Sequence, residues 1–260
     1  MIELTKENYL KIKVTGRFTR PQIAGEFGIP EWKLKKWISS NSLGTPRPRI
    51  KYPRAFREVT EEASYWAGFL AADGCVDEVG RVRLYLQLSD HPHLQKFAEF
   101  VGSNHTLSLN EKRNRCSLEF TCKDMVEDLL RWNIVPRKSI LYCPPERVGL
   151  LQPFLRGLFD GDGTICESFS NKRSITATLY AGLACSYACR DWLIRVLPLI
   201  SEKITLKQHE RDNHVTITMN TNKSKVFLRY LNENSTQATR LDRKYNLYVK
   251  TVVNNDRKTR

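Results

Sequence analysis

Two stretches of this sequence, 89 residues apart, repeat one pattern of apolar, small and acidic residues, and this repeat constrains the fold most. The first stretch is Trp66-Ala-Gly-Phe-Leu-Ala-Ala-Asp-Gly74, and the second is Leu155-Arg-Gly-Leu-Phe-Asp-Gly-Asp-Gly163. Each has two small residues four positions apart, which let two helix backbones approach closely. Each ends in Asp-Gly, and glycine readily ends a helix. The pattern predicts two apolar helices that pack together, each with an aspartate at its C-terminal end.

The places of these aspartates predict a cation site. Asp73 and Asp162 lie at the negative end of a helix dipole, where a carboxylate is unfavourable unless a cation is near. Two such helices in contact bring the carboxylates together, and carboxylate oxygens are ligands that Mg²⁺ prefers. Asp160 has no counterpart because the first motif has Ala71 at that place. The predicted pair is therefore Asp73 with Asp162.

The segments that follow the two motifs repeat one order of elements. The first half has an expected strand at 81–89, a helix at 91–101, a hairpin at 106–110 and 116–121, and a helix at 123–132. The second half has an expected strand at 174–184, a helix at 190–200, a hairpin at 204–220, and a helix at 223–232. With its motif helix, each half follows the order α-β-β-α-β-β-α, which is an α+β pattern.

A helical segment precedes the repeat. Residues 20–38 predict a helix, a turn at Gly28 and a second helix that opens at Pro30. The basic residues Lys33 and Lys36 are left on the outside of the second helix. This arrangement resembles the helix-turn-helix DNA-binding family, whose second helix enters the major groove. The alternative is a small helical hairpin that only packs on its neighbour.

The stretch from Gly44 to Arg57 has five basic residues, three prolines and no acid. Prolines favour an extended chain, and an extended basic chain can run along phosphates. A plain linker is compatible with the same residues. The expected DNA contacts in this stretch are Arg47, Arg49, Lys51 and Arg54.

Composition narrows the class of partner. The net charge of +14 and the pI of about 9.5 favour a polyanion, of which nucleic acid is the commonest. Seven cysteines without a CxxC pair favour reduced thiols over a zinc site. The chain shows neither an apolar run of membrane length nor a signal peptide, so we expect a cytoplasmic, nucleoid-associated protein without a membrane partner.

Both nonapeptides resemble the LAGLIDADG motif of homing endonucleases, in the single-chain form with two pseudo-symmetric halves. The resemblance covers about residues 60–250, and the departures at Trp66 and Ala71 are not at the metal position. It implies a saddle whose four-stranded sheets straddle DNA, with the motif helices at its centre. The implied activity is site-specific hydrolysis of both strands of a long DNA target by a monomer.

The resemblance also implies roles for single residues. The last acid of each family motif binds metal, so Asp73 and Asp162, with the adjoining Ala72 and Gly161, are the expected ligands of two or more Mg²⁺ or Mn²⁺ ions. The family has a lysine beside the active site, and Lys138 and Lys244 match it in Pro136-Arg-Lys-Ser139 and Asp242-Arg-Lys-Tyr245. Asp90 matches a family position that organises water. The catalytic candidates are therefore Asp73, Asp162, Lys138, Lys244 and Asp90. The counterpart of Asp90 in the second half is Ser186 or Cys185, so the two sites are expected to be unequal.

Polar residues on the strands and in their loops are the expected contacts to base edges and phosphates. They are Arg81, Arg83, Tyr85, Gln87, Arg113, Arg115, Lys172, Arg173, Thr178, Tyr180, Thr216 and Thr218. For any one of them, a simply exposed strand face explains the pattern equally well. The run Asp90-His-Pro-His93 predicts the start of a surface helix rather than a metal site.

The expected organisation has five parts. They are a helix-turn-helix segment at 1–42, a basic linker at 43–57, a first half at 58–150, a second half at 151–254, and a basic tail at 255–260. The competing hypothesis for function is a DNA-binding regulator that does not cleave, or an intron RNA maturase, on the same fold. Degenerate domains of that kind usually lose the motif acids, and this chain has both.

Overall fold

The computed structural model describes residues 2–14, 18–43, 48–138, 141–169, 177–201, 207–211 and 214–254. The chain forms two compact units, Met1–Arg47 and Pro48–Arg260, and each is considered by itself. Within the described ranges, no helix combines the length and apolar character needed to cross a bilayer.

The first unit packs three helices around a small core. They are α1 (Lys6–Val14), α2 (Arg20–Glu26) and α3 (Glu31–Ser40). Pro21 suits the first turn of α2, and Gly28 takes the left-handed conformation, φ +62°, in the turn before α3. The buried residues are Tyr9, Ile23, Ala24, Phe27 and Leu34. A helix pair joined by a glycine turn is therefore present, as the sequence predicts.

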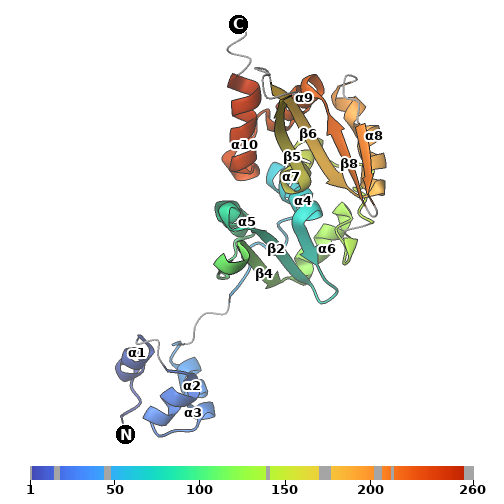
Figure 1. The fold of residues 1–260 in the computed structure, drawn as a ribbon. Helices are drawn as coiled ribbons and strands as arrows, with labels where there is room; N and C mark the ends of the chain where they lie inside the picture. The colour runs from blue at the N-terminus through green and yellow to red at the C-terminus, as the bar shows by residue number, and fades with distance from the viewer. Residues whose placement is uncertain are drawn as a thin grey trace. The chain divides into compact units, whose positions relative to one another are not determined.

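The second unit repeats the predicted α-β-β-α-β-β-α order twice (Figure 1). The first half contains α4 (Glu61–Asp73), β1 (Gly74–Val76), β2 (Arg81–Gln87), α5 (His91–Val101), β3 (Ser108–Asn110), β4 (Arg115–Thr121) and α6 (Lys123–Leu129). The second half contains α7 (Leu151–Asp162), β5 (Gly163–Phe169), β6 (Ala177–Cys185), α8 (Tyr187–Ile200), β7 (Lys207–Arg211), β8 (His214–Met219) and α9 (Thr221–Asn232). The helix α8 begins three residues before the predicted 190, because the Ser186 side chain caps it by accepting from the Cys189 N–H.

The motif helices α4 and α7 lie side by side at the centre of the unit (Figure 1). Their backbones touch at two glycines. A Cβ at Gly68 would lie 2.0 Å from the carbonyl oxygen of Phe154, and one at Gly157 would lie 1.9 Å from that of Tyr65. No side chain fits at either place, which is the physical reason for a small residue in each motif.

Each half has one antiparallel four-stranded sheet, in the orders β1-β2-β4-β3 and β5-β6-β8-β7. The registers match, because Gly74 pairs with Leu84 in the first sheet and Gly163 pairs with Leu183 in the second. Along β2, Val82, Leu84 and Leu86 are buried, while the residues between them are partly exposed. Each sheet therefore turns one face to the helices and leaves a second face open.

Two segments flank these halves. After α9 the chain forms a 3₁₀ turn, η5 (Gln237–Thr239), then α10 (Asp242–Tyr248) and a π-helical turn, η6 (Val249–Val253). Before α4, the Lys51 and Tyr52 N–H groups donate to the carbonyls of Gly102 and Val101 at 3.0 and 3.1 Å. The basic stretch is therefore held on the second unit from about residue 49.

Candidate functional site

The two motif aspartates lie at the ends of adjacent helices. Asp73 is the last residue of α4 and Asp162 the last of α7, and the following glycines begin β1 and β5. A Cβ at Gly161 would lie 2.3 Å from the Ala72 Cβ and 3.5 Å from Asp73 Oδ2. The close helix packing therefore brings the ends of both helices, with their carboxylates, to one place.

Neither carboxylate has a protein donor among the described residues. Partial burial raises the pKa of Asp73. Partial burial, with the charge of Asp73 next in weight, raises the pKa of Asp162 to about 6. Both side chains nevertheless remain exposed to solvent. Two exposed carboxylates without donors, one of which raises the pKa of the other, fit a hard cation.

A complete cage of side chains is not part of this arrangement. The described residues contain no cluster of three or more His, Cys, Asp or Glu side chains placed to hold a metal ion. A cation between Asp73 and Asp162 would take its other oxygens from the backbone, from water or from a substrate, as Mg²⁺ often does. The expected ligands Ala72 and Gly161 could supply only carbonyls.

The two predicted lysines lie at the ends of the same helices, with their ammonium groups turned to the backbone. Lys138 donates to the carbonyl of Ala71 at 2.6 Å. Lys244 donates to the carbonyls of Phe159 and Asp160, each at 2.7 Å, and of Gly163 at 2.5 Å. A cation at a helix C-terminus satisfies its free carbonyls and the helix dipole.

Both lysines are buried, and burial lowers the pKa of Lys138 and, to about 8, that of Lys244. The charges of both motif aspartates oppose this shift in each lysine. The lysines therefore lie near the predicted metal ligands, and they also stabilise the helix ends that carry them.

Around Asp73 the site is polar and charged. An open pocket of about 330 Å³ includes Asp73, Gln87, Asp90, Arg115 and Arg243 in its wall. Asp90 is buried, and its two carboxylate oxygens each accept a hydrogen bond from Arg243 Nε at 3.0 Å. The expected water-organising residue is thus held by an arginine from α10.

Around Asp162 the site has different chemistry. A pocket of about 240 Å³ beside this aspartate includes Leu158, Cys185, Ser186 and His214 in its wall. The Ser186 hydroxyl is engaged, because it caps α8 and donates to the Tyr142 carbonyl. When the two halves are aligned by strand register, Ser186 corresponds to Gln87. When they are aligned by the N-cap residues of α5 and α8, Ser186 corresponds to Asp90. Neither Cys185 nor Ser186 reproduces the carboxylate that Asp90 brings to the first site.

The open face of the first sheet carries the predicted polar residues. Arg83 pairs with Asp77 at 3.1 Å, and Arg81 pairs with Glu119 at 3.4 Å. The Arg115 guanidinium lies over the Tyr85 ring, 4.6 Å from its centre. Some of the basic charge on this face therefore has acidic or aromatic neighbours that orient it.

The other predicted DNA contacts are placed less evenly. On the second sheet, Tyr180 is exposed, and Thr216 and Thr218 are half-buried. Elsewhere, the predicted contacts that lie at the surface are Gln87, Arg113, Arg49, Lys51, Lys33 and Lys36. Arg54 instead contacts Asp124, Glu127 and Asp128 of α6 at 3.2, 2.7 and 2.9 Å. Arg47, Lys172, Arg173 and the Thr178 side chain lie outside the described residues.

The histidine run corrects one expectation. α5 does begin at His91, but His93 is only 2% exposed and does not lie on a surface. Its Nε2 is 3.0 Å from the Tyr65 hydroxyl, and burial lowers its pKa to about 3. The side chain is a neutral part of the core.

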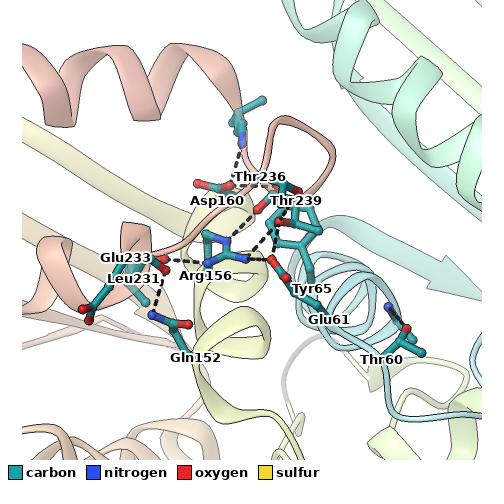
Figure 2. Close-up of polar contacts among 12 residues, drawn as sticks. Thr60, Glu61, Tyr65, Gln152, Arg156, Asp160, Leu231, Glu233, Thr236 and Thr239 are labelled. Atoms are coloured by element: carbon teal, nitrogen blue, oxygen red, sulfur yellow. Dashed lines mark hydrogen bonds and ion pairs between the residues drawn. The ribbon is translucent and has the colours of Figure 1, made fainter.

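Sequence reasoning missed Arg243, Arg156 and the role of Asp160. Arg243 adjoins the assigned Lys244, so the Arg-Lys pair was the available signal. Arg156 is 2% exposed on α7 and donates to Glu61 Oε1 at 2.8 Å (Figure 2). A lone arginine in an apolar helix was the signal for a buried partner, but its partners are distant in sequence.

Comparison with known proteins rests on structure alone, because no family model and no curated protein sequence matches this chain. The solved structure of the I-LtrWI LAGLIDADG homing endonuclease bound to target DNA matches with a TM-score of 0.54 at 10% identity, over 75% of this chain and 90% of that one. The meganuclease I-SmaMI bound to uncleavable DNA matches with a TM-score of 0.53 at 10% identity, over 75% and 91%. At these identities the likeness shows a common fold.

Proposed function

We propose that this chain, which has the fold of the single-chain LAGLIDADG homing endonucleases, is a site-specific endonuclease that cuts both strands of DNA. The observation that carries the proposal is the pair Asp73 and Asp162 at the meeting ends of α4 and α7, without protein donors and with raised pKa values. A binding protein has no need of two adjacent carboxylates, one of which raises the pKa of the other.

The metal ions, Mg²⁺ or Mn²⁺, would activate water and stabilise the leaving oxygen of a phosphodiester. The residues of the chain hold and surround that chemistry. Asp73 and Asp162 would hold the ions, and Asp90, whose carboxylate accepts from Arg243, would orient water at the first site. Lys138 and Lys244 keep positive charge near both carboxylates, where a phosphate would lie.

The rest of the second unit suits duplex DNA. Each half presents the open face of a four-stranded sheet with polar and basic residues, which can reach base edges and phosphates. Both motif aspartates come from one chain, so we propose that a monomer acts on a long target. The net charge of +14 favours this partner.

We expect the wild-type protein with Mg²⁺ to linearise a plasmid that carries the DNA flanking its gene, joined as it would be without the gene. A plasmid without that junction should stay intact, and chelation of the metal should stop the reaction. The measurement is the conversion of supercoiled to linear DNA on a gel. Tight binding to the junction without cutting under Mg²⁺ or Mn²⁺ would instead support the regulator; binding only to intron RNA would support the maturase.

We further propose that the first unit also contacts the target DNA. Lys33, Lys36 and a 63% exposed Trp32 lie on α3, the second helix of the glycine-turn pair. An exposed basic helix preceded by a packed helix is the arrangement that enters a major groove. The exposed Arg49 and Lys51 of the basic stretch that follows would add phosphate contacts.

Replacing both Lys33 and Lys36 with alanine should weaken DNA binding and leave cutting of saturated DNA unchanged. Each lost phosphate contact reduces the slope of log affinity against log salt by about 0.9. The measurement is fluorescence anisotropy over a salt series. Lys11→Ala on α1, where Lys11 is exposed and pairs with Glu7, is the matched control. Unchanged affinity and slope in the α3 variant would mean that this unit does not bind DNA.

A further inference from the structure

Asp160 breaks the symmetry of the two motifs, because the first motif has Ala71 in its place. It lies on α7, close to the end that carries Asp162, and its side chain is buried. One carboxylate oxygen, Oδ2, accepts from the Tyr65 hydroxyl at 2.8 Å and from the Leu241 backbone N–H at 2.7 Å. The carboxylate therefore joins the first motif helix to the segment that precedes α10.

Arg156, one turn earlier on α7, holds the same segment (Figure 2). Its guanidinium donates to the Thr239 carbonyl at 2.6 Å and to the Leu231 carbonyl at 2.8 Å. It also donates to the Thr239 hydroxyl at 3.0 Å, and that hydroxyl donates to Glu61 Oε1 at 2.8 Å. Residues 231–241 are thus fixed by side chains from both motif helices.

The segment leads directly to the first site. Leu241 is the N-cap residue of α10, and Arg243 lies two residues later, where it donates to both oxygens of Asp90. Lys96 of the first half secures the same turn, because it donates to Asp242 Oδ2 at 2.9 Å and to the Arg240 carbonyl at 3.1 Å. The amide that Asp160 holds is therefore close to the arginine that places Asp90 beside Asp73.

The described residues of the first half form no matching arrangement. Ala71 cannot accept a hydrogen bond through its side chain. Arg137, which corresponds to Arg243 in the repeated Arg-Lys pair, is exposed and makes no ion pair among the described residues. The buried carboxylate therefore serves one site of the two.

We infer that Asp160 is a positioning residue for the site of Asp73, although it belongs to the motif of Asp162. By holding the Leu241 N–H, it fixes the start of α10 so that Arg243 stays on Asp90 in the pocket beside Asp73. This inference rests on the proposed endonuclease function. A carboxylate loses its hydration when it is buried, and this costs free energy unless hydrogen bonds replace the lost water. The hydrogen bond from the Leu241 N–H offsets part of that cost and at the same time holds the start of α10.

The test measures the cutting of each DNA strand separately, on a duplex labelled at both 5′ ends, with Asp160→Ala. Arg243→Ala first identifies the strand that depends on the Asp73 site. We expect Asp160→Ala to slow that strand by about tenfold or more and the other strand by less than about threefold, because small displacements of positioned groups have effects of this size. DNA nicked in the other strand should accumulate.

Two further variants separate positioning from loss of packing. Asp160→Asn retains an oxygen that can accept both hydrogen bonds, and it should recover most of the rate on the affected strand. Tyr65→Phe removes the other partner of Asp160 and should leave the ratio of the two strand rates unchanged. If Asp160→Ala does not fold, Leu241→Pro removes the N–H at a residue with φ −83°, near the range of proline, and should give the same strand-specific loss.

A second readout does not depend on cutting. In the protein without DNA or metal, Asp160→Ala should speed hydrogen exchange at the Leu241 amide and in the first turn of α10, while α4 stays protected. Unchanged exchange there, or an equal slowing of both strands, would overturn the inference. Failure of the wild type to cut either strand would instead overturn the proposed function, and the exchange experiment would still decide whether Asp160 fixes α10.

Discussion

Replacement of either motif aspartate with asparagine, Asp73→Asn or Asp162→Asn, will abolish DNA cleavage and leave DNA binding nearly unchanged. Asparagine retains the volume and one oxygen but removes the charge that holds a divalent cation. Loss of an ion that would both activate water and stabilise the leaving oxygen should lower the rate by about a thousandfold or more. The measurements are plasmid cleavage with Mg²⁺ and anisotropy with the same DNA in Ca²⁺.

Asp191→Asn is the matched control for this experiment. Asp191 is an exposed carboxylate on α8 that pairs with Arg190 at 2.7 Å and lines neither of the pockets beside the motif aspartates. It should cut like the wild type. Cleavage that survives in the double variant of Asp73 and Asp162 would contradict the metal site, whatever its effect on binding.

The Asp162→Asn variant will also be more stable than the wild type when no metal is present. Folding raises the pKa of Asp162 from 3.8 to about 6, so the folded state binds a proton more tightly than the unfolded state does. The ionised carboxylate therefore costs stability, and this cost grows as the pH rises from about 4 to about 6 and stays above it. We expect Asp162→Asn to raise Tm by on the order of 2–4 °C at pH 8 and by less at pH 4.5. Added Mg²⁺ should raise Tm only in the wild type.

The substitution Gly157→Ala, which places one methyl group at the helix crossing, will lower the free energy of unfolding more than any other substitution proposed above. The new Cβ would lie 1.9 Å from the Tyr65 carbonyl oxygen and 2.8 Å from the Phe69 nitrogen, and both are backbone atoms that cannot turn aside. The two helices must separate along the unit's core, at a cost on the order of 3–5 kcal/mol. The measurement is urea unfolding, and DNA cutting should fall as well, because the aspartates lie beyond the crossing.

Gly182→Ala on β6 is a control within the same unit. Its Cβ would be 3.4 Å from the nearest atoms, the Ile217 carbonyl oxygen and Thr218 Cγ2, so small adjustments suffice. We expect a change in the free energy of unfolding below about 1 kcal/mol. Equal loss of stability in Gly157→Ala and Gly182→Ala would mean that the helix crossing is not the special constraint described above.

The features that sequence could predict are local or repeated. Alternation in residues 81–89 predicts β2, and the shared Asp-Gly ends place Asp73 and Asp162 on paired helices, because both signals lie within a few residues. The order of elements follows from the repeat itself. Sequence alone could not decide which residue of the second half corresponds to Asp90, because the strands before the two positions end differently. In the structure, Ser186 corresponds to Gln87 by strand register and to Asp90 by its place at the start of a helix.

The features that sequence could not predict depend on contacts between distant residues. Asp160 meets Tyr65 and Leu241, which are 95 and 81 residues away along the chain. His93 looked like a surface residue because its burial comes from the aromatic side chains of α4. Arg54 looked free in a basic stretch, and only the docking of that stretch reveals its three acidic neighbours on α6.

The glycine contacts at the helix crossing are reciprocal, and this has a consequence for symmetry. Exchanging the equivalent positions of the two motifs, which are 89 residues apart, turns one glycine and its partners into the other glycine and its partners. The first set is Gly68 with Phe154 and Leu158, and the second is Gly157 with Tyr65 and Phe69. Such contacts make an isologous interface, the kind that joins identical subunits about a two-fold axis.

Two identical halves joined in this way would be equal by necessity. A pair of first halves would have Ala71 twice, and a pair of second halves would have Cys185 and His214 at both centres. Covalent linkage of two different halves releases the chain from that equality while it retains the two-fold joint. One centre can then contain Asp90 and Arg243 while the other lacks them. Two unequal centres suit a DNA target that is not palindromic.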